Sequence, residues 1–226
     1  RIDRNWNASP GPGKVNLPDE RASDTTEWGV SLGGPAVKDR LFYFLAFNRQ
    51  LPTLDFENLA PFGSPPHRRS QEEDRSYRFA KLTWLAGERH RVEFTYLGDP
   101  VAQRHFDLAG DASVKDEQLP DRTRGGTSFM LHHTAILSSS FTWTNVLGLH
   151  RTAFRWSPSN PEVGPFRAQL DAPGSESFGR YGEDQLQRLR NLTLKSEVSL
   201  GWADHTLKGG LQVYEQAFEQ TYKRPS

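Results

Sequence analysis

The stretch GVSLGGPAVKDRLFYFLAFN, residues 29–48, predicts two β-strands joined by a short turn near residues 35–38. Gly33 and Gly34 can adopt a positive φ at little cost, and Pro35 fixes its own φ, so the three together favour a change of chain direction. After Asp39 and Arg40 the chain becomes dense in aromatic residues, which are common in strands. By physical chemistry alone, this stretch is a β-hairpin.

The rest of the chain repeats the hairpin pattern three times. Apolar and polar residues alternate along each expected strand, and a period of two indicates a strand with one apolar face. The expected short turns lie near residues 35–38, 86–88, 138–140 and 203–205, and the expected long loops cover residues 51–74, 98–125 and 156–185. Residues 1–25, rich in proline and glycine, are expected to form an irregular lead-in or linker. The sequence therefore predicts an all-β fold over residues 26–226: an antiparallel up-and-down meander of about eight long strands in four hairpins.

The composition is poor for a large water-surrounded domain. Only 35% of the residues are hydrophobic, and the mean hydropathy is −0.72. No window holds eighteen apolar residues, which excludes a transmembrane helix. A membrane β-barrel remains compatible, because its strands alternate lipid-facing apolar residues with polar residues that face the lumen.

Charge and cysteine content narrow the function classes. Lys plus Arg and Asp plus Glu number 28 each, so there is no overall field to attract nucleic acid, and we expect none as a partner. The absence of cysteine removes disulfides, thiolate metal sites and cysteine nucleophiles. The chain starts at Arg1 without a leader, and we expect it to be an excerpt from a longer protein.

Three regularities indicate an outer-membrane barrel. Short turns alternate with long loops, as they do in such barrels. Several expected strands exceed the roughly 9 to 11 residues that a tilted strand needs to span a bilayer, whereas soluble sheets average about 5 or 6. Trp84, Trp143 and Trp202 lie beside short turns in the apolar phase of their strands, where an aromatic girdle at the membrane interface would sit, and Tyr96 lies at the opposite end.

The first hairpin also resembles a signature of TonB-dependent outer-membrane receptors, most closely the subgroup with a carboxypeptidase-regulatory-like N-terminal domain. The residues that carry the resemblance are Gly33, Gly34, Pro35, Lys38, Asp39, Arg40, Leu41, Phe42, Tyr43 and Phe44. The resemblance implies a wall segment of a receptor in the bacterial outer membrane that imports a scarce substrate, such as a siderophore, vitamin, glycan or peptide. It implies as partners the outer-membrane lipid, a plug domain inside the barrel and the TonB complex, the last two engaged through parts outside this chain. We expect no cofactor.

The polar phase of the strands would face the lumen if the apolar phase faces lipid, and the resemblance implies that such residues contact the plug. The predicted lumen-facing residues are Arg91, Glu93, Lys195, Glu197, Lys208 and Gln212. The resemblance also implies that the outer loops capture substrate. The candidate substrate-binding residues in those loops are Phe56, His67, Phe106, Phe166 and Tyr181.

We predict no catalytic, metal or cofactor-binding residue and no enzyme activity. His132 and His133 are adjacent on a strand and would point to opposite faces, so they cannot readily share a metal. An outer-membrane enzyme would instead place His132, His133 or His150 near a carboxylate and a nucleophile. A further alternative is a soluble all-β ligand- or carbohydrate-binding module, which predicts that Trp84, Trp143 and Trp202 are buried in a closed core.

Two structural questions stay open in the sequence. His133 and Asn145 interrupt the apolar phases of the third hairpin, so its register is open by one residue, and a one-residue slip would exchange its two faces. Eight strands could form an open, curved sheet, which we expect, or close into a small barrel.

Overall fold

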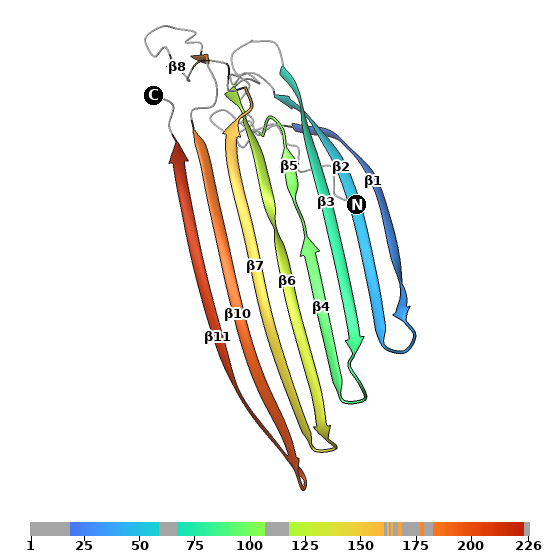
Figure 1. Cartoon of the computed structure of the whole chain (residues 1–226). Coiled ribbons are helices and arrows are strands. Elements are labelled where there is room, and N and C mark those ends of the chain that lie inside the picture. The colour runs from blue at the N-terminus through green and yellow to red at the C-terminus, as the bar shows by residue number, and fades with distance from the viewer. Residues whose placement is uncertain are drawn as a thin grey trace.

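The structure is a computed structural model, and it describes residues 19–58, 67–106, 118–160, 162, 164, 167–168, 177–178 and 183–223. Nearly all of the described chain is β-strand (Figure 1). The strands are β1 (Asp19–Val37), β2 (Leu41–Asn58), β3 (His67–Leu85), β4 (His90–Gly98), β5 (Val101–Gln103), β6 (Pro120–Ser138), β7 (Phe141–Pro158), β8 (Arg167–Ala168), β9 (Ser177–Phe178), β10 (Asp184–Trp202) and β11 (His205–Lys223). No described helix has both the length and the apolar composition to cross a membrane.

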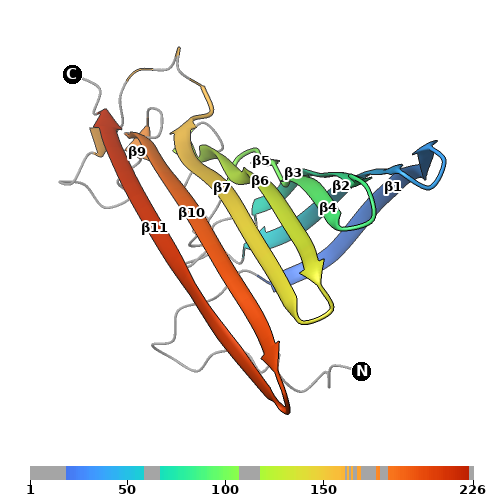
Figure 2. The same cartoon turned by 60° about the horizontal axis from the view of Figure 1, so that its bottom comes forward.

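Nine of these strands form one antiparallel sheet with the order β1-β2-β3-β4-β6-β7-β10-β11. The short β5 continues the line of β4 and pairs with β3 on one side and β6 on the other. Strands that follow one another along the chain are therefore neighbours, as predicted for an up-and-down meander. β1 and β11 lie at the two edges and do not pair with each other, so the sheet is open. Figure 2 shows that the sheet is curved.

The first hairpin differs in detail from the prediction. β1 continues through Gly33, Gly34 and Pro35, and the turn occupies residues 38–40, where Asp39 has a φ of 59°. Gly33 instead provides space, because a Cβ there would lie 2.8 Å from Cδ2 of Phe44 on β2. Pro35 is tolerated because β1 is an edge strand, and the register shifts between Pro35 and Val37. The predicted turn at residues 35–38 was thus too early.

The strands are longer than predicted, and the loops are correspondingly shorter. The predicted loop 51–74 contains the end of β2 and the first part of β3, which pair with each other from Thr53 and Glu72 onward. The predicted loop 98–125 contains β5 and the start of β6, and the predicted loop 156–185 contains the end of β7, the start of β10 and the short pair β8 and β9. β1 also begins at Asp19, inside the predicted lead-in. The other short turns lie where they were expected, at residues 86–89, 139–140 and 203–204.

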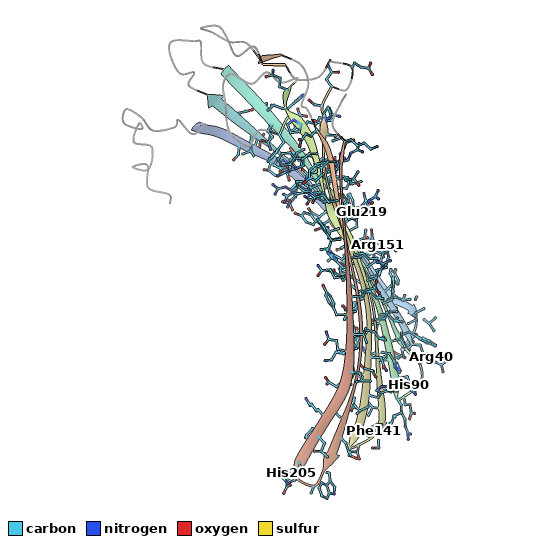
Figure 3. All side chains as sticks on the ribbon, turned by 90° about the vertical axis from the view of Figure 1, so that its left-hand side faces the viewer. Arg40, His90, Phe141, Arg151, His205 and Glu219 are labelled. Carbon is cyan, nitrogen blue, oxygen red and sulfur yellow. The ribbon has the colours of Figure 1, made fainter. Side chains whose placement is uncertain are left out.

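The sheet has almost no apolar core. Among the described residues, the buried apolar ones are Val101, Leu119 and Ala135. Side chains stand off both faces of the curved sheet (Figure 3). Most side chains are therefore exposed on one face of the sheet or the other, and the pairing register shows which residues share a face.

Candidate functional surfaces

One face of the sheet is a continuous apolar surface. Residues that pair directly across antiparallel strands point to the same face. A single row of such pairs crosses the sheet from β2 to β11 and consists of Tyr43, Leu82, Phe94, Leu131, Leu147, Leu194 and Val213. All of these except Tyr43 are exposed large hydrophobic residues. We call this side of the sheet the apolar face.

The four predicted girdle residues all belong to the apolar face. Trp84, Trp143 and Trp202 lie beside short turns and are exposed to 50%, 39% and 69%. The soluble-module alternative predicted that they are buried, and this is wrong. Tyr96 lies at the other end of β4, where its ring contacts Phe129 at 5.2 Å between centroids. The apolar face therefore carries aromatic side chains near both of its ends.

His133 and Asn145, which interrupt the apolar phases of the third hairpin, contact each other. His133 pairs directly with Asn145 across β6 and β7, and Nδ2 of Asn145 lies 3.3 Å from Nδ1 of His133. Nε2 of His133 is also 3.1 Å from Nδ1 of His90. The register of the third hairpin therefore keeps Phe129, Leu131 and Ala135 on the apolar face. The polar side chains of His133 and Asn145 are accommodated there by hydrogen-bonding distances to each other and to His90.

The predicted lumen-facing residues lie on the opposite side, which we call the polar face. One row of pairs contains Thr83, Glu93, His132, Val146, Lys195 and Gln212, and the neighbouring polar rows contain Arg91, Glu197 and Lys208. Glu93 accepts from Lys81 Nζ at 2.7 Å and from Arg91 Nη2 at 2.9 Å, and Nδ1 of His132 lies 3.6 Å from its other oxygen. Lys195 contacts Glu197 at 2.9 Å. The charges on this face are thus largely matched in pairs along and across the strands.

A second polar site lies at the end of the sheet opposite the short turns, where the strands continue past their apolar residues. We call this site the rim cluster. It consists of Glu73, Arg75, Gln103, Arg122 and Arg124 from β3, β5 and β6. The Glu73 side chain is only 2% exposed. Arg75 donates to both of its oxygens at 2.7 and 3.0 Å, Gln103 donates at 2.6 Å, and Arg124 lies at 3.5 Å. Nε of Arg122 in turn donates to the amide oxygen of Gln103.

The rim cluster has more cations than anions. Burial raises the pKa of Glu73, but the hydrogen bonds and charges of Arg75, Gln103 and Arg124 lower it by more, so the carboxylate stays ionised. Two guanidinium groups, those of Arg75 and Arg124, contact this one carboxylate, and the third, that of Arg122, is linked to it through Gln103. Charge-assisted hydrogen bonds of this kind are strong. A hollow of about 390 Å³ beside the cluster is lined on the polar face by Arg75, Tyr77, Arg124, Thr152 and Phe154, among others. This arrangement can bind an anionic or hydrogen-bonding group.

Phe106 is the predicted substrate-binding residue whose surroundings the structure describes. Its ring is half-buried, with Arg122 Cζ 3.6 Å from the ring centroid and Trp156 at 6.0 Å. Phe56 lies in β2 and His67 begins β3, but their side chains are outside the description. Phe166 and Tyr181 lie outside the described residues. The structure thus brings one of the five predicted residues to the rim cluster.

The rim cluster was not predicted from the sequence. The available signal was the spacing of charges two residues apart, Glu73 with Arg75 on β3 and Arg122 with Arg124 on β6, which places each pair on one face of its strand. Their association could not be read from the sequence, because it depends on β5 bridging the two strands.

The histidines form no group of three or more possible metal ligands within the described residues. His132 and His133 point to opposite faces: His132 lies next to Glu93, and His133 lies next to His90. His150 Nδ1 is 2.7 Å from Ser128 Oγ, but its other ring nitrogen contacts Thr152 Oγ1 at 2.7 Å rather than a carboxylate. A serine nucleophile normally requires a base oriented by an acidic group, and the described contacts of His150 do not include one.

The comparisons with known proteins agree with this architecture at the level of fold. No protein-family model matches the sequence, and no curated protein matches it. A solved structure does: the outer membrane transporter YddB from Escherichia coli superposes on 88% of this chain with a TM-score of 0.60 at 13% sequence identity. The match covers 26% of the YddB chain, so this chain spans about a quarter of that transporter's length. The sheet therefore has the fold of part of an outer-membrane transporter, a partial β-barrel as predicted.

Proposed function

We propose that this chain forms part of the barrel wall of a transporter in the bacterial outer membrane, with its apolar face toward lipid and its polar face toward the lumen. The observation that carries this proposal is the exposed apolar row that crosses the sheet from β2 to β11. Monomeric soluble proteins rarely expose apolar patches of more than a few hundred Å². In lipid, unlike in water, the exposure of such an apolar face costs no free energy.

The lengths of the elements support the same proposal. β4 has 9 residues, and on the apolar face of β10 the stretch beyond Arg190, from Leu192 to Trp202, is apolar apart from Ser196. Both lengths fit the roughly 9 to 11 residues needed by a tilted spanning strand. Above this span the strands continue as polar extensions that carry the rim cluster. In an outer-membrane barrel such extensions lie outside the bilayer, so the rim cluster would stand near the outer mouth of the lumen.

The finer proposal is that the parent protein is a TonB-dependent receptor of the subgroup with a carboxypeptidase-regulatory-like domain. It is supported by the signature between Gly33 and Phe44, which forms the first hairpin, and by the fold shared with an outer membrane transporter. In this proposal the polar face contacts a plug domain, and the rim cluster contacts the imported siderophore, vitamin, glycan or peptide. The chain itself has no catalytic role. Growth on the imported substrate should then be lost when TonB is deleted.

Single cysteines test the orientation of the two faces, because this chain has none of its own. Leu194 and Thr193 are neighbours on β10 that point to opposite faces. In the full-length protein in outer membranes, we expect Leu194→Cys to resist a water-soluble maleimide and to react with a lipid-soluble one. We expect Thr193→Cys to react with the water-soluble reagent once the protein is solubilised and its lumen is open. Labelling of Leu194→Cys by the water-soluble reagent in intact membranes would contradict the proposal.

A further inference from the structure

A hollow of about 970 Å³ lies on the apolar face, at the end of the apolar belt that is farthest from the short turns. Its floor consists of small residues of that face, including Gly125, Thr127, Ala153 and Ala217. Gly125 has a φ of +124°, and a Cβ there would lie 2.3 Å from the backbone oxygen of Asp99. The backbone therefore excludes a larger residue at Gly125, and the hollow is part of the fold.

Five arginines line this hollow: Arg124 belongs to the rim cluster, and the other four lie on the apolar face. Arg78, Arg151 and Arg190 belong to one row of pairs that also contains Gly98 and Thr127, and Arg188 lies two residues along β10 on the same face. Arg151 pairs directly with Arg190 across β7 and β10. Like charges directly opposite each other destabilise a sheet.

Only two of the four arginines have a carboxylate partner in the described part of the chain. Arg190 contacts Glu215 at 2.8 Å, and Arg188 contacts Glu219 at 3.5 Å. Arg78 and Arg151 are exposed and make no ion pair with any described residue. The hollow thus carries an excess of positive charge that the described protein does not neutralise.

The position of the hollow indicates what neutralises it. Tyr96 lines the hollow, and the next row of the apolar face toward the short turns contains Tyr96, Phe129, Leu149 and Leu192. The hydroxyl of Tyr96 lies over Gly98, 2.8 Å from where a Cβ would be, and so points toward the arginine row. Aromatic side chains with a polar tip mark the boundary between hydrocarbon and headgroups. An anion at this depth beside a lipid-facing surface is a headgroup phosphate.

We propose that this hollow binds the phosphate of an anionic lipid headgroup, held by Arg78 and Arg151, with Arg190 and Arg188 completing the positive field. Guanidinium groups match phosphate oxygens in a bidentate geometry, which makes arginine the suitable residue. The proposal rests on the proposed orientation of the apolar face toward lipid. It adds a specific site for a lipid headgroup to a surface that would otherwise contact only the acyl chains of the lipid.

The test measures retention of phosphatidic acid by the full-length protein in neutral detergent, using native mass spectrometry, with phosphatidylcholine as the uncharged comparison. Arg78→Gln with Arg151→Gln removes the two unpaired charges and leaves no described carboxylate without its partner. Each lost charge should weaken binding of phosphatidic acid roughly fivefold, so the double variant should bind about 25-fold less tightly. Arg78→Lys with Arg151→Lys keeps the charge and should retain most of the binding. The matched control, Lys195→Gln with Lys208→Gln, removes two charges from the polar face and should bind like the wild type.

Three outcomes would overturn the proposal: unchanged binding in the Arg78 and Arg151 glutamine variant, an equal loss in the Lys195 and Lys208 variant, or complete displacement of phosphatidic acid by millimolar inorganic phosphate. The last outcome would identify a site for free anions instead of lipid. Resistance of unheated protein to unfolding in dodecyl sulfate shows that each variant is folded. The cysteine labelling of Leu194 and Thr193 is independent of these arginines. Failure of phosphatidic acid binding with the labelling pattern intact would therefore refute the headgroup site and leave the barrel-wall function standing.

Discussion

Replacing Leu194 with arginine separates a lipid-facing surface from a water-facing one. Leu194 is 51% exposed and lies within the apolar belt on β10, between Arg190 and Trp202. If lipid covers this face, an arginine costs about 2 to 4 kcal/mol at the bilayer midplane and about 0 to 1 kcal/mol at the interface. The apolar belt on β10 runs from Leu192 to Trp202, so Leu194 lies nearer to its end at Leu192 than to its centre. We therefore expect a loss of about 2 kcal/mol, a factor of roughly 30 in the folding equilibrium. If water covers the face, a substitution at so exposed a position should change stability by no more than about 0.5 kcal/mol.

The assay is reversible urea unfolding of the full-length protein from phosphatidylcholine vesicles, followed by tryptophan fluorescence. The change in the free energy of unfolding comes from the shift of the midpoint at constant slope. Thr193→Arg is the matched control, because its side chain points to the polar face, and it should unfold like the wild type. Trp202→Arg, beside a short turn, should cost less than Leu194→Arg. Equal midpoints for Leu194→Arg, Thr193→Arg and the wild type would refute the assignment of the apolar face to lipid.

Two other predictions concern backbone space and the rim cluster. A Cβ at Gly126 would lie 2.4 Å from the backbone oxygen of Arg151, whereas none of the described atoms lies within 4 Å of one at Gly209. Gly126→Ala should therefore lower the free energy of unfolding by about 1 to 3 kcal/mol, and Gly209→Ala should leave it equal or slightly higher; equal losses for both would contradict the close approach of β6 and β7. Glu73 lies outside the apolar belt, and its pKa is lowered in the folded protein. Its contribution to stability is therefore full above its unfolded pKa and is lost as the pH falls through the folded one. Urea unfolding measured from pH 3 to 7 tests this. The free energy of unfolding of the wild type should exceed that of Glu73→Gln by about 1 to 3 kcal/mol at neutral pH, and the two values should converge at acidic pH. A difference that stays constant with pH would show that the carboxylate is not the group responsible.

The parts of the fold that the sequence predicted correctly are those in which one face is apolar. Leu82 and Trp84, or Leu194 and Leu200, alternate with polar residues, and that period fixes both the strand and the face of each side chain. The apolar stretches of the strands, the meander and the three later turns follow from this pattern. His133 and Asn145 made the register of the third hairpin ambiguous, and the structure resolves it by pairing them with each other.

The polar extensions of the strands gave no such signal. Residues 70–76 contain no apolar side chain, and residues 51–58 alternate between apolar and charged side chains only from Leu54 to Glu57, so neither stretch has the sustained period that predicts a strand. They were therefore assigned to loops, and the rim cluster was missed with them. The early turn prediction had a different cause. Gly33 leaves room for the Phe44 ring and does not have a positive φ, and a glycine in a sequence does not distinguish these two needs.

The two open edges of the sheet carry backbone groups that need hydrogen-bond partners from outside the sheet. Along each edge strand, β1 and β11, alternate residues direct their N–H and C=O groups away from the sheet, and the structure describes no strand that receives them. Water can satisfy these groups above the bilayer, but hydrocarbon cannot, and each unpaired group inside it costs several kcal/mol. A helix, a loop or a lipid offers no regular ladder of complementary groups at the spacing of a strand. In a membrane this wall must therefore be continued on both sides by further strands, and closure of that series is what makes the polar face the lining of a pore.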